Sequence, residues 1–382
     1  TLSVQSKLVV TLFSNPYSIN DFLFTNNFDG FILAYQNSRT AQEFAAQSIF
    51  GGIGLSGKLP VSTHHYKLNS GLKTKDIRIK YTIAEEVKVN EELLYKIDSL
   101  AENAIKEKAT PGCQIVIAKD GKVFFRRSFG YHTYAKKNKV KNTDLYDIAS
   151  ITKIAATVPM LMHMQEEGGF GLGYKLGKLN ERLYYTDKGH LRVRDILAHQ
   201  AGLQAWIPFY KKTINEDNTF RDTLYSTFIS EEYPIKVAED LYLHFSYPDS
   251  ILLQIAESEL LEEKEYLYSD LGYYLFKEII ERRYNIPLNL LVQENFYRSL
   301  GLATMGYLPK ERFEKDRIIP TEKDNYFRDQ LLVGDVHDMG AAMQGGVGGH
   351  AGLFSNANDL AILMQMYLEK GTYAGKEYFK SS

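Results

Sequence analysis

Two segments of the chain place a serine three residues before a lysine. Ser150 and Lys153 lie in DIASITKIAATVPM, and Ser70 and Lys73 lie in SGLK. On a helix, residues three positions apart share a face, so such a lysine sits beside the serine hydroxyl. A lysine in a partly dehydrated site loses its proton more easily and can activate that hydroxyl as a nucleophile. The spacing therefore indicates covalent acyl transfer, provided that a helix holds the two side chains together.

The sequence after Ser150 predicts such a helix, whereas the sequence after Ser70 does not. Apolar residues recur at helical spacing over three turns, at positions 151, 154, 155, 158, 161 and 162. The start of this helix would bring positive potential and free N–H groups to a developing oxyanion. Gly71 follows Ser70 directly and no amphipathic pattern follows Lys73, so we expect no chemical role for Ser70. For Ser150 two interpretations stay open: a nucleophile with its proton partner, or a helix cap followed by a solvated lysine.

A second polar segment also precedes a helical pattern. Tyr268, Ser269 and Asp270 stand in YLYSDLGYYLFKEIIERR. Ser-x-x-Lys followed about a hundred residues later by such a segment resembles the serine β-lactamase and penicillin-binding-protein family, in particular its class C β-lactamase, D-aminopeptidase and esterase branch. RVRDILAHQAGLQAW and GGVGGHAGLFSNANDLAILMQMYL resemble two further segments of that family. The resemblance covers residues 90–382.

The resemblance implies roles for four residues. Ser150 would be the acylated nucleophile, Lys153 its proton partner, and Tyr268 the phenol that passes a proton to the leaving group. Asp270 would stand where class C β-lactamases have asparagine; because a carboxylate only accepts hydrogen bonds and favours a charged lysine, this departure argues against true β-lactamase activity. Core packing for Tyr268 and a helix cap for Asp270 are the alternatives. We expect His199, in LAHQAGL, to be structural rather than a base.

The family also uses a third motif, Lys-Thr-Gly or His-x-Gly, on a strand that lines the site and contributes to the oxyanion hole. GHAG contains His350, but LFSNANDLAILMQMYL directly after it predicts a helix capped by Asn356 or Asn358. A helix is the wrong context for that motif, so we assign His350 to an earlier family segment. We expect the true third motif, the last sheet strands and the final helix to lie beyond Ser382.

The first 62 residues form a separate pattern. KLVVTLF (7–13) and GFILAY (30–35) predict buried strands, and TAQEFAAQSIFGG (40–52) predicts a helix capped by Thr40. This alternation is typical of a parallel sheet. With SGKLPVS, these segments resemble the end of the C-terminal α/β domain of family 3 glycoside hydrolases, whose start would precede Thr1. The carboxylate pair that glycosidase chemistry requires cannot be assigned in this chain.

Residues 63–89 are polar and basic and predict a linker with one edge strand at most. Asn90 is expected to cap an amphipathic helix, and CQIVIA and KVFFRRSF flank a KDG turn as a hairpin. We therefore predict an α/β (α+β) fold. Residues 90–382 would form a β-lactamase/transpeptidase-like domain, with an antiparallel sheet flanked by helices, an all-helical region and an incomplete C-terminal end. An N-terminal α/β-sandwich remnant (1–62) would precede it.

Composition narrows the range of partners. The chain has 382 residues and a net charge of −2, so no global basic field points to nucleic acid. It has no apolar run of membrane-spanning length. No G-x-S-x-G, H-E-x-x-H, C-x-x-C or phosphate-binding loop is present, and we expect neither a cofactor nor a metal. The expected partner is a small-molecule or peptidoglycan-derived substrate, and the oligomeric state is not predicted.

The leading hypothesis is a serine hydrolase that forms an acyl-enzyme with an ester, amide or β-lactam. The two resemblances together suggest cell-wall metabolism in a bacterial periplasm or envelope. One alternative is that the parent protein is a family 3 β-N-acetylhexosaminidase or other glycosidase, with this part as an accessory domain. Another is a peptidoglycan-binding module without catalysis.

Overall fold

The computed structural model describes residues 6–22, 27–262 and 265–380. The chain forms two compact units, and each unit is assembled from three segments of the sequence. Unit 1 comprises Thr1–Asp98, Val116–Arg126 and Gln365–Tyr378, and unit 2 comprises Ser99–Ile115, Arg127–Met364 and Phe379–Ser382.

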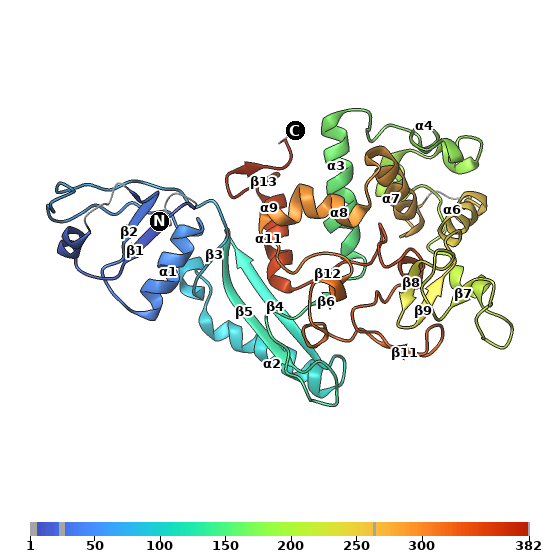
Figure 1. Ribbon diagram of the computed structural model, residues 1–382, viewed down its shortest axis with the longest axis horizontal. Coiled ribbons are helices and arrows are strands. Elements are labelled where there is room, and N and C mark those ends of the chain that lie inside the picture. The colour runs from blue at the N-terminus through green and yellow to red at the C-terminus, as the bar shows by residue number, and fades with distance from the viewer. Residues whose placement is uncertain (1–5, 23–26, 263–264, 381–382) are drawn as a thin grey trace. The chain divides into compact units, whose positions relative to one another are not determined.

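Unit 1 contains the strand–helix pattern predicted near the N-terminus. Strand β1 (Val9–Leu12) runs parallel to β2 (Gly30–Leu33), and helix α1 (Arg39–Ile49) follows (Figure 1). The strands and the helix are confirmed, but both strands are partly accessible rather than buried, because two strands and one helix cannot cover a sheet. The predicted cap is wrong. Ser38 caps α1, since it keeps an extended backbone and its hydroxyl accepts the Ala41 N–H, whereas Thr40 already lies in the helix.

A three-stranded sheet follows in the order β3 (Lys80–Tyr81), β5 (Lys122–Gly130), β4 (Gly112–Lys119). The hairpin predicted at KDG is confirmed. Asp120 and Gly121 have φ angles of 52° and 72°, which suit a two-residue hairpin turn. The edge strand expected within residues 63–89 is β3, which runs parallel to β5.

Residues 365–378 return the chain to unit 1. The Tyr373 hydroxyl accepts the Ile79 N–H at 3.2 Å, and the Ala374 N–H donates to the Ile77 carbonyl at 2.8 Å. A small hairpin, β13 (Thr372–Tyr373) with β14 (Lys376–Glu377), holds this segment. Unit 1 is therefore closed by residues from both ends of the chain.

The helix predicted after Asn90 is confirmed. Asn90 accepts the Glu92 N–H at 2.9 Å and caps a 3₁₀ turn, Glu91–Leu93, which leads into α2 (Leu94–Lys106). The other 3₁₀ turns are Pro16–Asp21, Ala84–Val87, Glu181–Leu183, Asp187–His190, Phe209–Thr213, Pro309–Glu311 and Lys315–Arg317.

Unit 2 is mainly helical. The helix predicted after Ser150 is confirmed: it passes through a π-helical turn (Lys153–Thr157) into α3 (Val158–Glu167) and ends at Gly168. Helix α3 packs against α7 and α8, and α7 packs against α6 (Figure 1). The remaining helices are α4 (Leu176–Leu179), α5 (Val193–Leu197), α6 (Tyr247–Glu257), α7 (Leu271–Tyr284), α8 (Leu288–Val292), α9 (Arg298–Leu300), α10 (Met339–Ala342) and α11 (Ala357–Leu368), with a π-helical turn at Gln293–Tyr297.

Short strands connect distant segments of unit 2. The pair β6 (Tyr146–Asp147) and β12 (Phe354–Ser355) brings the segment before Ser150 beside the segment after His350. Leu145, Ile318, Val333 and Phe354 form a buried cluster at this pair. The other strands are β7 (Tyr225–Ser226), β8 (Ile235–Ala238), β9 (Leu241–Leu243), β10 (Lys323–Asp324) and β11 (Gln330–Leu331).

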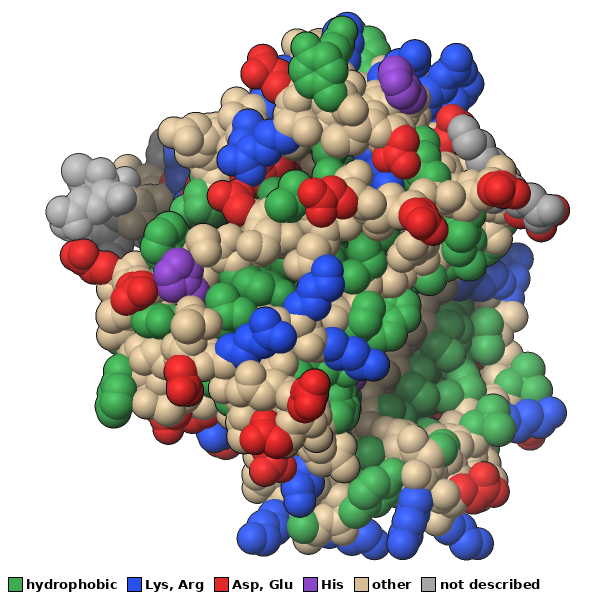
Figure 2. All heavy atoms as spheres, turned by 90° about the vertical axis from the view of Figure 1, so that its right-hand side faces the viewer, with side chains coloured by type: hydrophobic (Ala, Val, Ile, Leu, Met, Phe, Trp, Pro, Cys, Tyr) green, Lys and Arg blue, Asp and Glu red, His purple; other side chains and the backbone are tan. Residues whose placement is uncertain are grey.

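The described surface carries charges of both signs. On the face shown in Figure 2, acidic and basic side chains are interspersed, with hydrophobic side chains between them. Among the described helices, none combines the length and the apolar character needed to cross a membrane.

Candidate active site

Ser150 lies at a sharp turn between β6 and the helix that follows. Ala149 has a φ angle of 45°, a left-handed conformation that is uncommon for a residue with a side chain. Asp147 supports the turn, since its carboxylate accepts the N–H groups of Ala149 and His337, each at 2.8 Å. Ser150 is exposed, and its own N–H donates to no other described residue. The turn thus presents a hydroxyl and a free N–H together at a helix start.

Lys153 is buried beside Ser150, with 3% of its surface exposed. Its Nζ donates to Ser150 Oγ at 2.9 Å and to Asp270 Oδ1 at 2.6 Å. The backbone carbonyl of His350 is a third acceptor at 3.4 Å. Three acceptors match the three protons of an ammonium group. The interpretation of Lys153 as a solvated residue of the first helical turn is therefore wrong.

Asp270 stands at the N-cap position of α7, but its side chain does not cap the helix. Ser269 does so instead, because its Oγ accepts the Leu271 N–H at 3.2 Å and donates to the Gln204 carbonyl at 2.6 Å. The Asp270 carboxylate is thereby left free to contact Lys153. A helix-cap role for the Asp270 side chain is excluded by this arrangement.

Tyr268 is not a core residue, since 43% of its surface is exposed. Its ring centroid lies 4.8 Å from Lys153 Nζ, and the ring of Tyr273 lies at 5.4 Å. Both distances are within the range of a cation–π interaction. The ammonium therefore contacts two aromatic rings in addition to its hydrogen-bond acceptors.

His199 positions the segment that carries Tyr268 and Asp270. Its Nδ1 accepts the Ser269 N–H at 3.0 Å, and its ring lies 4.5 Å from that of Tyr268. Burial lowers the pKa of His199, and the positive charge of Lys153 lowers it further, which keeps Nδ1 available as an acceptor. These contacts agree with the structural role expected for this histidine.

His350 meets the site through its backbone rather than its side chain. Thr157 Oγ1 donates to the Gly349 carbonyl at 2.6 Å and fixes the loop that presents the His350 carbonyl to Lys153. The imidazole points elsewhere, because its Nε2 lies 2.7 Å from Asp338 Oδ1. The helix predicted after this loop is α11, and Asn356 caps it by accepting the Asp359 N–H at 2.8 Å.

Comparison with known proteins places this geometry in a family. The sequence model of the Beta-lactamase family matches residues 97–378. The chain belongs to the Beta-lactamase family. The predicted fold class, an α/β (α+β) fold of β-lactamase/transpeptidase type, is confirmed, and the chain is a serine hydrolase of this family.

The curated relatives of this Beta-lactamase family chain include two bacterial proteins. The chain is 29% identical over 330 residues to the N-acetylmuramyl-L-alanine amidase of Bacillus subtilis (strain 168). The aligned region covers 79% of this chain and 69% of the amidase. It is 30% identical over 302 residues to a putative D-alanyl-D-alanine carboxypeptidase of Escherichia coli (strain K12), over 71% of this chain and 63% of that protein.

A solved structure shows the same fold. The octameric penicillin-binding protein homologue from Pyrococcus abyssi superposes with a TM-score of 0.55 at 20% sequence identity. The match covers 75% of this chain and 58% of the Pyrococcus protein, so the chain spans less than two thirds of that protein's length.

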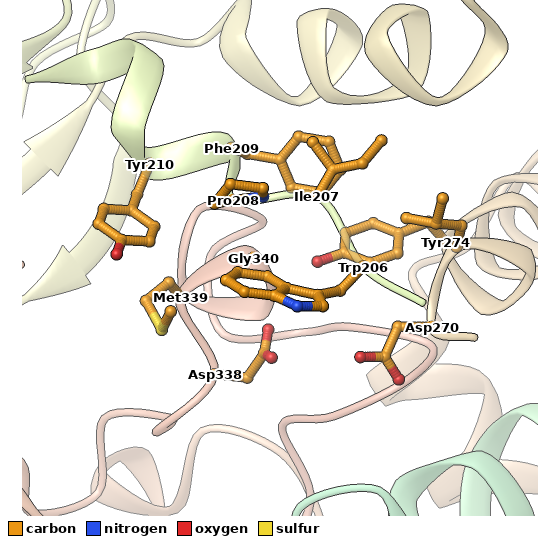
Figure 3. A pocket seen from close by; sticks show the side chains of 11 residues that line it. Trp206, Ile207, Pro208, Phe209, Tyr210, Asp270, Tyr274, Asp338, Met339 and Gly340 are labelled. Carbon is orange, nitrogen blue, oxygen red and sulfur yellow. The ribbon is translucent and has the colours of Figure 1, made fainter. Parts of the chain in front are cut away.

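A small pocket adjoins Asp270 in this Beta-lactamase family chain. Its volume is about 90 Å³, and the carboxylates of Asp270 and Asp338 lie near the indole of Trp206 (Figure 3). The pocket is lined by Trp206, Ile207, Pro208, Phe209, Tyr210, Asp270, Leu271, Tyr274, Asp338, Met339 and Gly340. Across the described part of the chain, no three His, Cys, Asp or Glu side chains are grouped as metal ligands.

The structure brings Ser150, Lys153, Tyr268 and Asp270 together. Sequence reasoning missed Asp338 and Trp206 beside this group, and it missed the contact made by the His350 carbonyl. Trp206 ends the segment RVRDILAHQAGLQAW, to which the resemblance assigned no chemical role, and Asp338 lies in none of the segments that carry the resemblance. A main-chain carbonyl has no signature in residue type, so the sequence held no signal for that contact.

Proposed function

We propose that Ser150 is the nucleophile of an acyl-transfer reaction, with Lys153 as its proton partner and Tyr268 as the phenol that serves the leaving group. The observation that carries the proposal is the hydrogen bond of 2.9 Å from the buried Lys153 ammonium to Ser150 Oγ. Nucleophile and base within hydrogen-bond distance, with the base oriented by a third group, are typical of covalent catalysis. Here Asp270 is that third group.

In the first step, Ser150 Oγ forms a bond to the carbonyl carbon of an ester, amide or β-lactam. Lys153 must be neutral to take the serine proton, and Asp270 is placed at 2.6 Å to accept the proton that the ammonium releases. The negative charge that develops on the carbonyl oxygen is met by the free N–H of Ser150 at the helix start.

The tetrahedral intermediate then collapses, and the bond to the leaving group breaks as that group takes a proton. Tyr268 is half exposed beside Lys153, where its hydroxyl can pass a proton from the lysine to the departing amine or alcohol. Water next attacks the acyl-enzyme while Lys153 takes its proton, and Lys153 returns that proton to Ser150 Oγ as the bond between Oγ and the acyl carbon breaks. When Asp270 then gives its proton back to Lys153, the complete cycle has returned the site to its starting protonation.

We infer that the substrate is a small-molecule or peptidoglycan-derived amide or ester and that the enzyme serves cell-wall metabolism in a bacterial envelope. The support is the naming of the relatives as an N-acetylmuramyl-L-alanine amidase and a putative D-alanyl-D-alanine carboxypeptidase. Asp270 in place of an amide side chain argues against β-lactams as the main substrate.

A fluorophosphonate probe tests the nucleophile directly. We expect the probe to label the chain, Ser150→Ala to lose the label, and Lys153→Met to slow labelling at least a hundredfold, in the range that loss of a general base produces. Ser70→Ala is the matched control because Ser70 has the same Ser-x-x-Lys spacing outside the site. Labelling that persists in Ser150→Ala would reject the assignment. Muropeptide binding without turnover, unchanged by Ser150→Ala, would favour a binding module.

We further propose that residues 1–62 are the tail of a family 3 glycoside hydrolase α/β domain, that 63–89 form a linker, and that 90–382 form the hydrolase domain. The parallel pair β1–β2 with α1 after it supports this division. An assay with p-nitrophenyl N-acetylglucosaminide would compare this chain with any longer gene product that contains it. Hydrolysis by the longer protein alone supports the proposal, and hydrolysis by neither contradicts the glycosidase function.

A further inference from the structure

We propose that the side chains of Asp338 and His350 form a positioning pair for catalysis, which fixes the backbone carbonyl that Lys153 contacts. The effect on catalysis rests on the proposed function, because it requires Lys153 to act as the proton partner of Ser150. The effect on the loop around His350 does not rest on it, and it can be measured without turnover.

The His350 imidazole is a buried side chain with two fixed contacts. The residue is 1% exposed, and its Nε2 lies 2.7 Å from Asp338 Oδ1. Because a carboxylate only accepts hydrogen bonds, Nε2 carries the proton of this contact. The ring also stacks on Tyr274 of α7, with the centroids 4.1 Å apart and the planes inclined by 19°. The imidazole therefore has little freedom to turn.

This side chain shares its Cα atom with the carbonyl that faces Lys153. The His350 carbonyl lies 3.4 Å from Lys153 Nζ, which is the longest of the three acceptor distances of the ammonium. Thr157 holds the preceding carbonyl, that of Gly349, at 2.6 Å. Without the contact to Asp338, the imidazole would no longer constrain the Cα atom that carries the next carbonyl.

Asp338 is a charged partner for this imidazole. Burial by itself raises the pKa of its carboxyl, but the neighbouring His350, its hydrogen bond and the Ala341 N–H together bring that pKa well below its ordinary value. The oxygen that contacts the imidazole also accepts the Ala341 N–H at 2.7 Å and caps α10. The contact with His350 is therefore a charge-assisted hydrogen bond, roughly twice as strong as one between neutral groups.

The backbone before Asp338 is anchored by a buried ion pair. The Arg328 guanidinium donates to the carbonyls of Val336 at 2.7 Å and His337 at 2.6 Å. Its Nε donates to Asp324 Oδ2 at 2.6 Å, and both of these side chains are fully buried. A planar guanidinium holds its partners in a rigid fork geometry, so residues 336–338 have a defined position.

The same segment supports the turn that presents Ser150. The His337 N–H donates to one carboxylate oxygen of Asp147 at 2.8 Å, and the other oxygen accepts the Ala149 N–H at 2.8 Å. Two adjacent residues thus support the turn of the nucleophile and the loop that faces its proton partner. A misplacement of about 1 Å can cost about a hundredfold in rate, so we expect Asp338 to affect the chemical step rather than binding.

The kinetics of fluorophosphonate labelling test the effect on catalysis. We expect Asp338→Ala to lower the maximal labelling rate by about tenfold to a hundredfold and to leave the half-saturating concentration unchanged. His350→Phe, which keeps an aromatic ring against Tyr274, should behave in the same way. The double variant should lose no more than the more impaired single variant, because both changes remove one contact. Asp338→Asn keeps an acceptor oxygen and should lose less than Asp338→Ala.

Asn180→Ala is the matched control, because Asn180 caps the 3₁₀ turn Glu181–Leu183 elsewhere in unit 2. Circular dichroism gives the folded fraction of each variant, so that rates are compared per folded molecule. If Asp338→Ala does not fold, His350→Phe replaces it. An unchanged maximal labelling rate in the folded variant, or single losses that multiply in the double variant, would overturn the effect on catalysis.

Hydrogen exchange tests the fixed loop without turnover, in the Ser150→Ala chain. Ile148 N–H donates to the Leu353 carbonyl, and Leu353 N–H donates to Thr152 Oγ1. We expect Asp338→Ala to speed amide exchange in peptides that cover residues 147–153 and 348–353 by about tenfold or more, which is the loss of one hydrogen bond to a charged group. Asn180→Ala should leave both peptides unchanged. Unchanged exchange in folded Asp338→Ala would overturn the positioning pair.

The two proposals fail separately. Labelling of Ser150 at the parent rate in the folded variants rejects the effect of the pair on catalysis and retains the nucleophile. Faster exchange in Asp338→Ala, in a chain that the probe does not label at Ser150, retains the fixed loop and rejects the nucleophile.

Discussion

The carboxylate of Asp270 lies 2.6 Å from the ammonium of Lys153, although the two residues are 117 positions apart in the chain. Lys153 is 3% exposed and the Asp270 side chain 24%, so the pair is largely shielded from water. Removing one member of such a pair leaves an uncompensated charge, which is strongly destabilising.

We expect Asp270→Ala to lower the free energy of unfolding by about 2–3 kcal/mol. This loss is somewhat smaller than that for breaking a fully buried ion pair, because the Asp270 side chain is 24% exposed. Asp270→Asn should lose less, because the amide oxygen can still accept from Lys153. Urea denaturation measures both, and the double variant Lys153→Met with Asp270→Ala completes a thermodynamic cycle. If the double variant loses as much as the sum of the single variants, the pair has no coupling and the prediction is wrong.

Protonation of His199 at acidic pH should lower both the stability of the fold and the activity of the site. The pKa of His199 is held below its ordinary value of 6.5 by burial first and by Lys153 second, with Asp270 opposing. The unfolded chain therefore binds more protons between the folded pKa and about pH 6.5. The contribution of His199 to the free energy of unfolding is fully present above about pH 6.5. It is lost as the pH falls from that value through the folded pKa. Protonated Nδ1 also cannot accept the Ser269 N–H, so activity should fall over the same range.

Urea titrations and hydrolysis rates between pH 5 and 8 measure this dependence. His199→Gln should remove the part of the pH dependence that the protonation of His199 causes. The amide oxygen of glutamine can accept the Ser269 N–H and does not titrate in this range. His65→Gln replaces an exposed histidine of unit 1 and serves as the control. An unchanged pH dependence in His199→Gln would refute the assignment.

The loop that presents the His350 carbonyl should tolerate no side chain at Gly349. A Cβ there would lie 2.2 Å from the Tyr273 carbonyl oxygen and 3.2 Å from Thr157 Oγ1. We expect Gly349→Ala to cost about 1–3 kcal/mol, as overpacking does, and to lower the hydrolysis rate because the carbonyl moves away from Lys153. Gly173→Ala is the control, since nothing lies within 4 Å of a Cβ at that position. Equal melting temperatures for the two variants would contradict the prediction.

Unit 1 contains an acid-sensitive ion cluster. Glu86 lies 2.7 Å from Lys80 and 2.8 Å from Lys122, and hydrogen bonds from Lys122, Lys80 and Thr82 lower its pKa from 4.5 to about 2. Because the folded pKa is depressed, the contribution to stability is complete above pH 4.5 and is lost as the pH falls toward 2. Since the side chain is partly exposed, solvent screening limits this contribution to about 1 kcal/mol.

We therefore expect Glu86→Gln to lower stability at pH 5 and to change it little near pH 2. Guanidinium unfolding at the two pH values measures the difference. Glu85→Gln, a change at the exposed neighbouring position, is the control. A Glu86→Gln chain that retains the full acid sensitivity of the parent would argue against the cluster.

Local patterns were sufficient for the elements that carry Ser150. The KDG hairpin, the helix after Asn90 and the helix after Ser150 each depend on neighbouring residues alone, and all three are confirmed. The cap of α1 was assigned to the wrong residue because Ser38 and Thr40 both suit an N-cap by type. What decides between them is where the backbone leaves its extended conformation, and in the structure this is after Ser38.

The site was predictable only where residue type carries the chemistry. The side chains of Lys153 and Asp270 stand in recognisable segments, and the structure places them in contact. The His350 carbonyl and the Trp206–Asp338 pocket depend on how loops far apart in the sequence meet. Such contacts between loops are determined by tertiary packing, and no local sequence pattern predicts them.

The hydrogen bond from Ile79 to Tyr373 joins residues 294 positions apart. A ribosome releases the first partner long before it translates the second. Throughout that interval unit 1 lacks the residues 365–378 that complete it, and an incompletely folded chain exposes surface that chaperones bind and that favours aggregation. Yield in the cell should therefore depend on the speed of translation through the middle of the message, even though no residue encoded there belongs to that hydrogen bond.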